Sequence, residues 1–211
     1  MSRQKITSVV FDLGGVLADL DRERCEASFR ALGLDGMVEL IDPYHPSAIL
    51  HELESGTADL QALHDYAVER WGVELPAAEI GLAYNSFVGE VAAWKLDYLL
   101  ELRGRGLRTF MLSNTSDVIF SEVSRREFTR RGLSVHDYFE GLYLSYRMGV
   151  MKPRPEIFEA MAADACLIPA ETLFIDDSPA NVATAKELGF ATLHAVQGED
   201  FRPRVEALLG V

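Results

Sequence analysis

The chain has 211 residues, of which 48% are hydrophobic and 25% charged, a balance typical of a globular enzyme rather than of a disordered or fibrous chain. Its formal net charge is −13 and it has no long run of lysine and arginine, which predicts that it binds no nucleic acid. The negative charge also means that any phosphate site must supply its own positive charge. Two widely separated cysteines, no leader-like N-terminal segment and no apolar run of membrane-spanning length predict a cytoplasmic protein that does not enter a membrane.

The first predicted element is a short strand. Residues 6–11 form an apolar run rich in β-branched side chains, which stops at Asp12 and is followed by Gly14 and Gly15. This pattern predicts a buried strand with a sharp exit.

Residues 22–94 have a different pattern. They show helical periodicity, clearest from Leu60 onward, interrupted by glycines and prolines, and they contain no convincing strand. We therefore interpret residues 22–94 as an all-helical cap, inserted between residues 1–21 and residues 95–211 of one core domain.

Strand and helix patterns alternate through the rest of the chain. This alternation predicts right-handed crossovers and an α/β, Rossmann-like core of three layers, in which helices cover both faces of a central parallel sheet. In such a sheet, ligands bind at the carboxyl ends of the strands. Strands are predicted over residues 108–112, 141–144, 172–175 and 191–195, and helices over residues 91–102, 116–130, 155–165, 179–188 and 201–209.

Polar residues come directly after the predicted strands or a short loop later, so the topology brings them to one edge of the sheet. Each has an ordinary explanation when taken alone, as a turn residue, a helix cap or an exposed loop. Two adjacent carboxylates after a buried strand, however, repel each other unless a cation joins them. The set that favours a functional site is Asp12, Ser113-Asn114-Thr115, Lys152 and Asp176-Asp177.

The acidic members of this set suit a metal-assisted reaction. A hard divalent cation such as Mg²⁺ prefers oxygen ligands, which Asp12 and one of Asp176 and Asp177 can supply. The cation would offset the repulsion between a carboxylate nucleophile and a phosphate. Asp12 can then attack phosphorus and form an aspartyl-phosphate that water later hydrolyses.

The remaining members suit the transferred phosphoryl group. The Ser113 hydroxyl and the Asn114 backbone N–H can hold its non-bridging oxygens. The Lys152 ammonium can neutralise the charge on the group. Together these residues predict a phosphate-binding catalytic site.

The chain resembles the haloacid dehalogenase (HAD) superfamily of phosphatases and related hydrolases. The resemblance covers the whole chain, and residues 22–94 stand where the family has its C1-type helical cap. It implies a Mg²⁺-dependent phosphatase of a small phosphorylated metabolite, with a sugar phosphate favoured. The four ordered motifs that carry it are Phe-Asp12-Leu-Gly-Gly-Val, Leu-Ser113-Asn-Thr, Met-Lys152-Pro-Arg-Pro-Glu-Ile-Phe and Phe-Ile-Asp176-Asp177-Ser.

The resemblance also implies roles for individual residues. Asp12 corresponds to the nucleophile and a Mg²⁺ ligand, and the Gly14 backbone carbonyl to a second ligand. Asp177 corresponds to the direct carboxylate ligand of the fourth motif. Asp176 corresponds to an acid that acts through water or on Lys152.

One position departs from the family pattern. Most of these phosphatases carry a second aspartate two residues after the nucleophile, which protonates the leaving group and later activates water, and here that residue is Gly14. General acid/base catalysis contributes about 10²–10⁴-fold in rate. Three explanations stay open: a substrate with a good leaving group, such as a sugar 1-phosphate; a substitute acid among Asp19, Asp21, His51 and Glu54; or a silent protein that binds a phosphate or a partner without turnover.

The first motif and the stretch His51-Glu-Leu-Glu-Ser-Gly-Thr are similar to the subgroup containing α-D-glucose-1-phosphate phosphatases, which tolerate glycine at this position. We therefore favour the first explanation, with Glu54 expected to reach the substrate from the cap. A haloacid dehalogenase is less favoured, because that reaction needs no metal and has no use for adjacent Asp176 and Asp177. The sequence leaves the substrate and the oligomeric state open.

Overall fold

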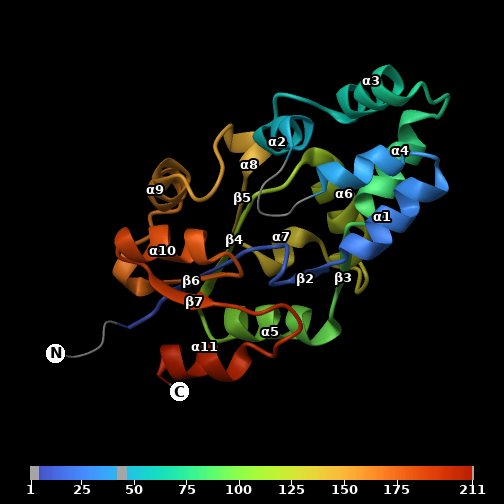
Figure 1. Ribbon diagram of the computed structural model, residues 1–211. Helices are drawn as coiled ribbons and strands as arrows, with labels where there is room; N and C mark the ends of the chain where they lie inside the picture. The colour runs from blue at the N-terminus through green and yellow to red at the C-terminus, as the bar shows by residue number, and fades with distance from the viewer. Residues whose placement is uncertain (1–4, 42–46, 211) are drawn as a thin grey trace.

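The computed structural model describes residues 5–41 and 47–210. At its centre is a parallel sheet in the strand order β5-β4-β1-β6-β7 (Figure 1). The predicted core strands are therefore all present, and the prediction of a Rossmann-like parallel sheet is confirmed. The strands are β1 (Ser8–Phe11), β4 (Arg108–Ser113), β5 (Gly141–Leu144), β6 (Thr172–Asp176) and β7 (Ala191–His194).

Helices cover both faces of this sheet. Successive residues of a strand point to opposite faces, so Val9 and Phe11 belong to one buried cluster and Val10 to another. The cluster around Val10 includes side chains of α9 and α10, whereas the cluster around Val9 includes side chains of α5 and α11. The core helices are α5 (Ala93–Gly104), α6 (Asp117–Glu127), α7 (Val135–Tyr138), α8 (Ser145–Met148), α9 (Pro155–Asp164), α10 (Pro179–Glu187) and α11 (Arg202–Leu209), with a 3₁₀ turn η2 (Pro169–Glu171).

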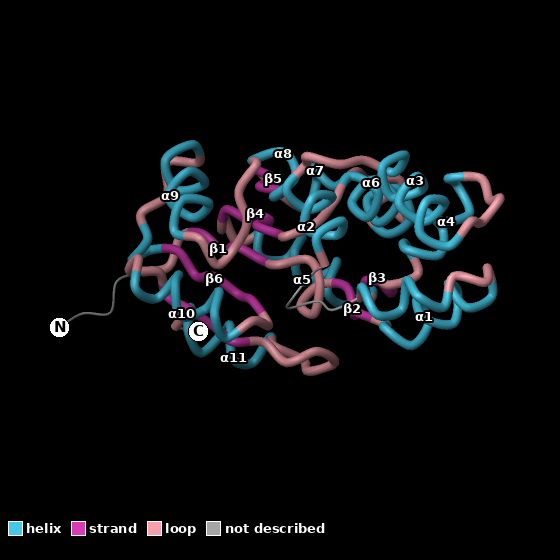
Figure 2. The backbone as a smooth tube through the Cα atoms, turned by 45° about the horizontal axis from the view of Figure 1, so that its top comes forward, coloured by secondary structure: helices cyan, strands magenta, loops and turns pink. Residues whose placement is uncertain are grey.

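The segment before α5 is mainly helical, as predicted. In both views α1, α3 and α4 lie together, on the side of the molecule away from α9 and α10, while α2 lies closer to α8 (Figures 1 and 2). Apolar side chains of this segment, such as Phe29, Leu53 and Ile80, join the same buried cluster as one face of the sheet. Its elements are α1 (Arg22–Ala31), the 3₁₀ helix η1 (Asp35–Leu40), α2 (Ala48–Ser55), α3 (Leu60–Trp71) and α4 (Ala77–Asn85).

Two short strands were not predicted. β2 (Ala18–Leu20) and β3 (Val88–Val91) pair in antiparallel fashion where the chain leaves the sheet and where it returns to it. The prediction that residues 22–94 contain no strand is therefore wrong, as is the prediction that a helix begins at residue 91. Both strands are too short to show a period of two, and they pair with residues far away in the sequence. The division into residues 22–94 and a core of residues 1–21 and 95–211 stays a prediction.

Within residues 5–41 and 47–210, no helix combines the length and the apolar character needed to span a bilayer.

Candidate active site

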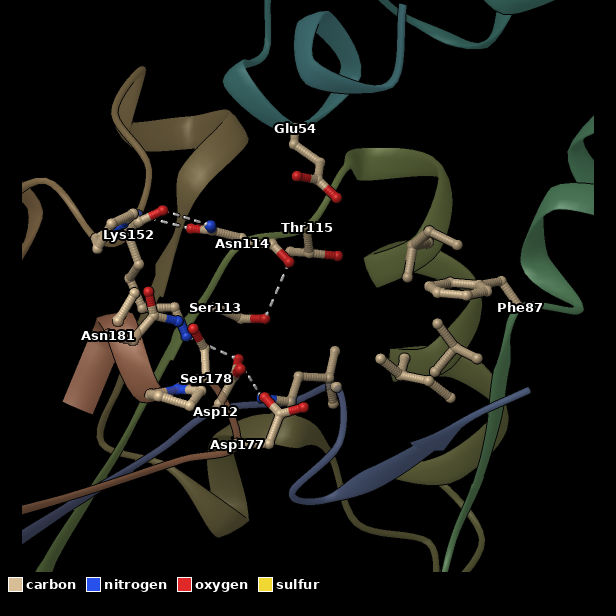
Figure 3. A pocket seen from close by; sticks show the side chains of 18 of the residues that line it. Asp12, Glu54, Phe87, Ser113, Asn114, Thr115, Lys152, Asp177, Ser178 and Asn181 are labelled. Carbon is tan, nitrogen blue, oxygen red and sulfur yellow. Dashed lines mark hydrogen bonds and ion pairs between the residues drawn. The ribbon is translucent and has the colours of Figure 1, made fainter. Parts of the chain in front are cut away.

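A cavity of about 500 Å³ lies at the carboxyl ends of β1, β4 and β6 (Figure 3). We call the residues at these strand ends and in the loop before α9 the floor: Asp12, Ser113, Lys152, Asp176 and Asp177. The structure thus brings the predicted residues of separate strands together, although Asp176 lies beneath the cavity and is fully buried. The predicted residues that line the cavity are Asp12, Gly14, Glu54, Ser113, Asn114, Thr115, Lys152 and Asp177.

Lys152 joins the acidic residues of the floor. Its side chain is 1% exposed, and Nζ lies 3.0 Å from Asp12 Oδ1 and 2.6 Å from Asp176 Oδ2. The third ammonium hydrogen goes to the carbonyl oxygen of Leu112 at 2.8 Å. Burial lowers the pKa of Lys152, but the two carboxylates outweigh burial and hold the pKa above its usual range. The floor therefore contains a permanent positive charge in a protein of negative net charge.

Asp176 is the fully satisfied partner of Lys152. Its Oδ1 accepts hydrogen bonds from the Ser178 backbone N–H at 2.8 Å and from Asn181 Nδ2 at 2.9 Å, while Oδ2 faces Lys152. These contacts fix the carboxylate in one orientation, so its geometry suits holding Lys152 in place. Sequence reasoning missed Asn181, whose only signal is its place in the first turn of the helix after the two aspartates.

Asp12 directs one oxygen into the protein and leaves the other for a ligand. Oδ1 accepts a hydrogen bond from the Leu13 backbone N–H at 2.7 Å and lies beside Lys152. In the part of the chain that the structure describes, no hydrogen bond to Oδ2 is present. Burial raises the pKa of Asp12 to about 7; Lys152 opposes this shift, while Asp176 and Asp177 add to it. A carboxylate placed here needs further positive charge to stay ionised.

The three aspartates of the floor can supply that cation site. Asp12, Asp176 and Asp177 each offer a carboxylate oxygen, and these oxygens lie within 4.8 Å of one another. Oxygen donors of this kind suit Mg²⁺. Gly15 makes room for the cluster: it has φ +71°, and a Cβ atom there would lie 2.2 Å from Asp177 Oδ2. His194, which was not predicted as a site residue, contacts Asp177: its Nε2 lies 2.8 Å from the Asp177 backbone oxygen.

Asn114 has a role that the sequence did not predict. Asn114 Nδ2 donates a hydrogen bond to the Lys152 carbonyl oxygen at 2.8 Å. The Lys152 backbone N–H donates one to Asn114 Oδ1, also at 2.8 Å. The side chain therefore fixes the loop that delivers Lys152. Ser113 is the last residue of β4 and is 1% exposed, with Oγ 3.4 Å from the Asn114 carbonyl oxygen. This long contact leaves the Ser113 hydroxyl available to the cavity.

The space beside Gly14 is apolar. A Cβ atom on Gly14 would lie 3.1 Å from Leu20 Cδ2, so Leu20 covers the place where a second acidic side chain would begin. Leu20 lines the cavity together with Phe87, Val88 and Ile119, and we call these four residues the apolar wall. Phe87 lies on the side of the cavity away from Lys152 (Figure 3). Sequence reasoning missed this wall because it depends on the unpredicted pairing of β2 with β3.

Glu54 lies opposite the floor, at the end of α2, and we call this position the roof (Figure 3). Its backbone oxygen lies 2.6 Å from Ser145 Oγ, a buried hydroxyl that also accepts a hydrogen bond from the Thr115 backbone N–H at 3.0 Å. Gly56 ends α2 with φ +77°, and a Cβ atom there would lie 2.0 Å from the Tyr146 carbonyl oxygen. The backbone of α2 is thus held tightly against α8, and this contact positions Glu54.

The chain matches the family model of haloacid dehalogenase-like hydrolases over residues 6–189 and belongs to this family. D-ribitol-5-phosphate phosphatase from Bacteroides thetaiotaomicron is 39% identical over 204 residues, which is 97% of this chain and 98% of that protein. A crystal structure of a HAD family enzyme from the same organism, in complex with magnesium and inorganic phosphate, has a TM-score of 0.89 at 39% identity and covers 94% of this chain and 98% of that chain. A HAD-like family hydrolase from Porphyromonas gingivalis has a TM-score of 0.88 at 38% identity, over 97% of this chain and 98% of that chain. The family predicted from the four motifs is therefore confirmed.

Proposed function

We propose that the chain is a Mg²⁺-dependent phosphatase of a small phosphorylated metabolite, a sugar or polyol phosphate, which reacts through an aspartyl-phosphate on Asp12. The observation that carries the proposal is the floor itself, where Asp12 lies 3.0 Å from the buried Lys152 and close to Asp177. The similarity to a ribitol-5-phosphate phosphatase and to an enzyme that binds magnesium and phosphate supports it.

In the first half of the reaction, Asp12 Oδ2 attacks phosphorus and forms a new oxygen–phosphorus bond. The bond from phosphorus to the leaving oxygen breaks on the opposite side, and its electron pair goes to that oxygen. The Lys152 ammonium, the Ser113 hydroxyl and the Asn114 backbone N–H stabilise the charge on the other phosphate oxygens. In the second half, water attacks the same phosphorus and releases inorganic phosphate and the Asp12 carboxylate.

The oxygen donors beside Asp12 fit a resident Mg²⁺. In this proposal Asp12, Asp177 and the Gly14 carbonyl hold the ion, and Asp176 acts through water or on Lys152. The bound ion supplies positive charge that allows a carboxylate and a phosphate dianion to approach.

Residues 22–94 act in this proposal as a cap over a core of residues 1–21 and 95–211. Glu54, which belongs to this segment, faces the part of the cavity that receives the leaving group. There it contacts the leaving group. The apolar wall around Phe87 limits the other side of the cavity. Substrate choice therefore depends on the cap, whereas phosphate chemistry depends on the strand ends.

The test is a hydrolysis screen of phosphorylated metabolites and one aryl phosphate, with and without Mg²⁺. The wild type and Asp97→Asn, which changes an exposed aspartate that pairs with Arg131, should release phosphate only with Mg²⁺. Asp12→Asn should release none, because an amide is not a nucleophile. Hydrolysis by Asp12→Asn at the wild-type rate would contradict the proposal. Halide release from haloacids in the presence of a chelator would favour a dehalogenase, and binding without turnover would favour a silent protein.

A further inference from the structure

The proposed reaction needs a proton donor that Gly14 cannot provide. The leaving oxygen of a polyol 5-phosphate, the substrate type named for the ribitol-5-phosphate phosphatase relative, belongs to a primary alcohol and is a poor leaving group unless it is protonated. Position 14 has no side chain, and Leu20 covers the adjacent space. The donor must therefore come from another element that faces the same cavity.

Three alternatives from the sequence analysis do not face the cavity. Asp19 is exposed, lies 3.3 Å from Lys95 Nζ and does not line the cavity. Asp21 caps α1 by accepting a hydrogen bond from the Arg24 backbone N–H at 2.9 Å. His51 is exposed on α2 and does not line the cavity. Each of these residues has a structural role or a position that removes it from the reaction.

Of the described titratable side chains that line the cavity, only Glu54 lies where it can donate a proton to the leaving oxygen. In the described part of the chain these side chains are Asp12, Glu54, Tyr84, Lys152 and Asp177. Asp12, Lys152 and Asp177 belong to the floor, where they serve the phosphoryl group or the metal ion. Burial and the neighbouring Glu54 raise the pKa of Tyr84, so the phenol stays protonated and cannot act as a base. Glu54 has no hydrogen bond or ion pair to its carboxyl group within residues 5–41 and 47–210.

The roof position of Glu54 matches the geometry of in-line transfer. Asp12 approaches phosphorus from the floor, so the leaving oxygen lies on the opposite side of the phosphorus atom, toward the roof. Figure 3 shows the Glu54 side chain descending from α2 toward the cavity, across from Asp12. The contact of its backbone oxygen with Ser145 Oγ at 2.6 Å holds this end of α2 in place.

We propose that Glu54 is the general acid and base of the phosphatase reaction, in place of the aspartate that position 14 lacks; this inference rests on the proposed function. The Glu54 carboxyl gives its proton to the leaving oxygen as the phosphorus–oxygen bond breaks and Asp12 becomes phosphorylated. The resulting Glu54 carboxylate then takes a proton from water as the water oxygen attacks phosphorus. The bond to Asp12 breaks, and the Asp12 carboxylate, inorganic phosphate and protonated Glu54 are regenerated.

The surroundings of Glu54 suit both steps. Burial raises the pKa of Glu54 to about 7, and the positive charge of Lys152 opposes this shift, so both protonation states are populated near neutral pH. Besides Lys152, the titratable groups that line the same cavity are Tyr84 of α4 and Asp12 and Asp177 of the floor. The elements packed against α2 add Tyr146 and Arg147 of α8 and His64, Asp65, Tyr66, Glu69 and Arg70 of α3, none of which is a cause of the shift.

The test compares Glu54→Gln with Glu52→Gln, an exposed glutamate of the same helix that does not line the cavity. The probes are D-ribitol 5-phosphate, a primary alkyl ester, and 4-nitrophenyl phosphate, whose leaving group needs no proton. Glu54→Gln should lose about 10²–10⁴-fold in kcat on the alkyl ester. On the aryl ester it should give a burst of nitrophenolate, because phosphorylation of Asp12 proceeds while hydrolysis of the aspartyl-phosphate is slowed. Glu52→Gln should behave as wild type.

The pH profile and a rescue variant add independent readouts. The wild-type kcat/KM for the alkyl ester should fall as the pH rises through the pKa of Glu54, because the free enzyme must carry the proton, and Glu54→Gln should lack this fall. Adding Gly14→Asp and Leu20→Ala to Glu54→Gln should restore part of the activity, because they place an acid at position 14 with room for it.

Wild-type rates for Glu54→Gln on the alkyl ester would overturn the inference while leaving the proposed function intact. Equal losses on both esters without a burst would also overturn it, since they indicate a binding or structural role. Failure of the wild type on both esters would instead contradict the proposed function.

Discussion

The floor and the roof of the cavity differ in how their charged groups are held. On the floor, Lys152 and Asp176 are fully buried and every polar atom of the pair has a partner, from the Leu112 carbonyl to Asn181. On the roof, the Glu54 carboxyl has no partner within the described residues, and its position depends on a backbone contact with Ser145. The floor is rigid and preorganised, whereas the roof carries a group that is free to exchange a proton.

This difference separates two parts of catalysis. A buried, fully bonded ion pair keeps its charge state and orientation, as stabilisation of a phosphoryl group requires. A lone carboxyl in a partly apolar cavity can change its charge state near neutral pH, as proton transfer requires. The family's usual arrangement places both functions beside the nucleophile, but Gly14 leaves that position of this chain without the acid, and in our proposal Glu54 supplies it from the roof.

The largest effect is expected from breaking the floor with Lys152→Met. The change leaves two carboxylates, on Asp12 and Asp176, without their common cation in a buried site. Removing one partner of a buried ion pair costs about 3–5 kcal/mol. We expect the free energy of unfolding in urea to fall by that amount in the presence of a chelator, and phosphatase activity to be lost. The double variant Lys152→Met/Asp176→Asn should recover part of the stability but no activity, and failure to recover any stability would contradict this account of the floor.

A smaller effect is expected from Gly15→Ala, with Gly149→Ala as its control. Both glycines have positive φ, +71° and +67°, so alanine should cost about 1–2 kcal/mol at each position. Only at Gly15 does the new Cβ atom meet a carboxylate, that of Asp177, whereas nothing lies within 4 Å at Gly149. Urea denaturation should therefore give similar losses, while phosphatase assays should show a loss of activity in Gly15→Ala alone. Equal activities would show that Asp177 does not depend on this close approach.

The last effect is expected on the roof, in the pH dependence of stability. Burial raises the pKa of Glu54 from its ordinary 4.5 to about 7, so the unfolded chain loses this proton at lower pH than the folded chain. Between these two values the folded state binds more protons, and the free energy of unfolding falls as the pH rises. Glu54→Gln should lack this fall, so its stability relative to wild type should increase from pH 4.5 to pH 7. Glu52→Gln should follow the wild type, and parallel curves for all three proteins would contradict the raised pKa of Glu54.

Most of the core could be predicted from local patterns. The strand at Ser8–Phe11 and the aspartate that ends it follow from an apolar run and a sharp glycine exit, and parallel topology alone places Asp12, Lys152 and Asp177 near one another. The pairing of β2 with β3 could not be predicted, because Ala-Asp-Leu and Val-Gly-Glu-Val are not continuous apolar runs and are too short to show a period of two. The apolar wall that includes Leu20 was missed for the same reason.

The sequence by itself determined the chemistry of this protein: strand ends in a parallel sheet must meet at one edge, so the order of the motifs was sufficient to assemble the floor. It also showed that position 14 carries no acid. Only the tertiary structure decided what stands near that position, because contacts between segments far apart in the sequence depend on packing rather than on local pattern. Those contacts put Leu20 beside Gly14 and Glu54 above the cavity, held through Ser145.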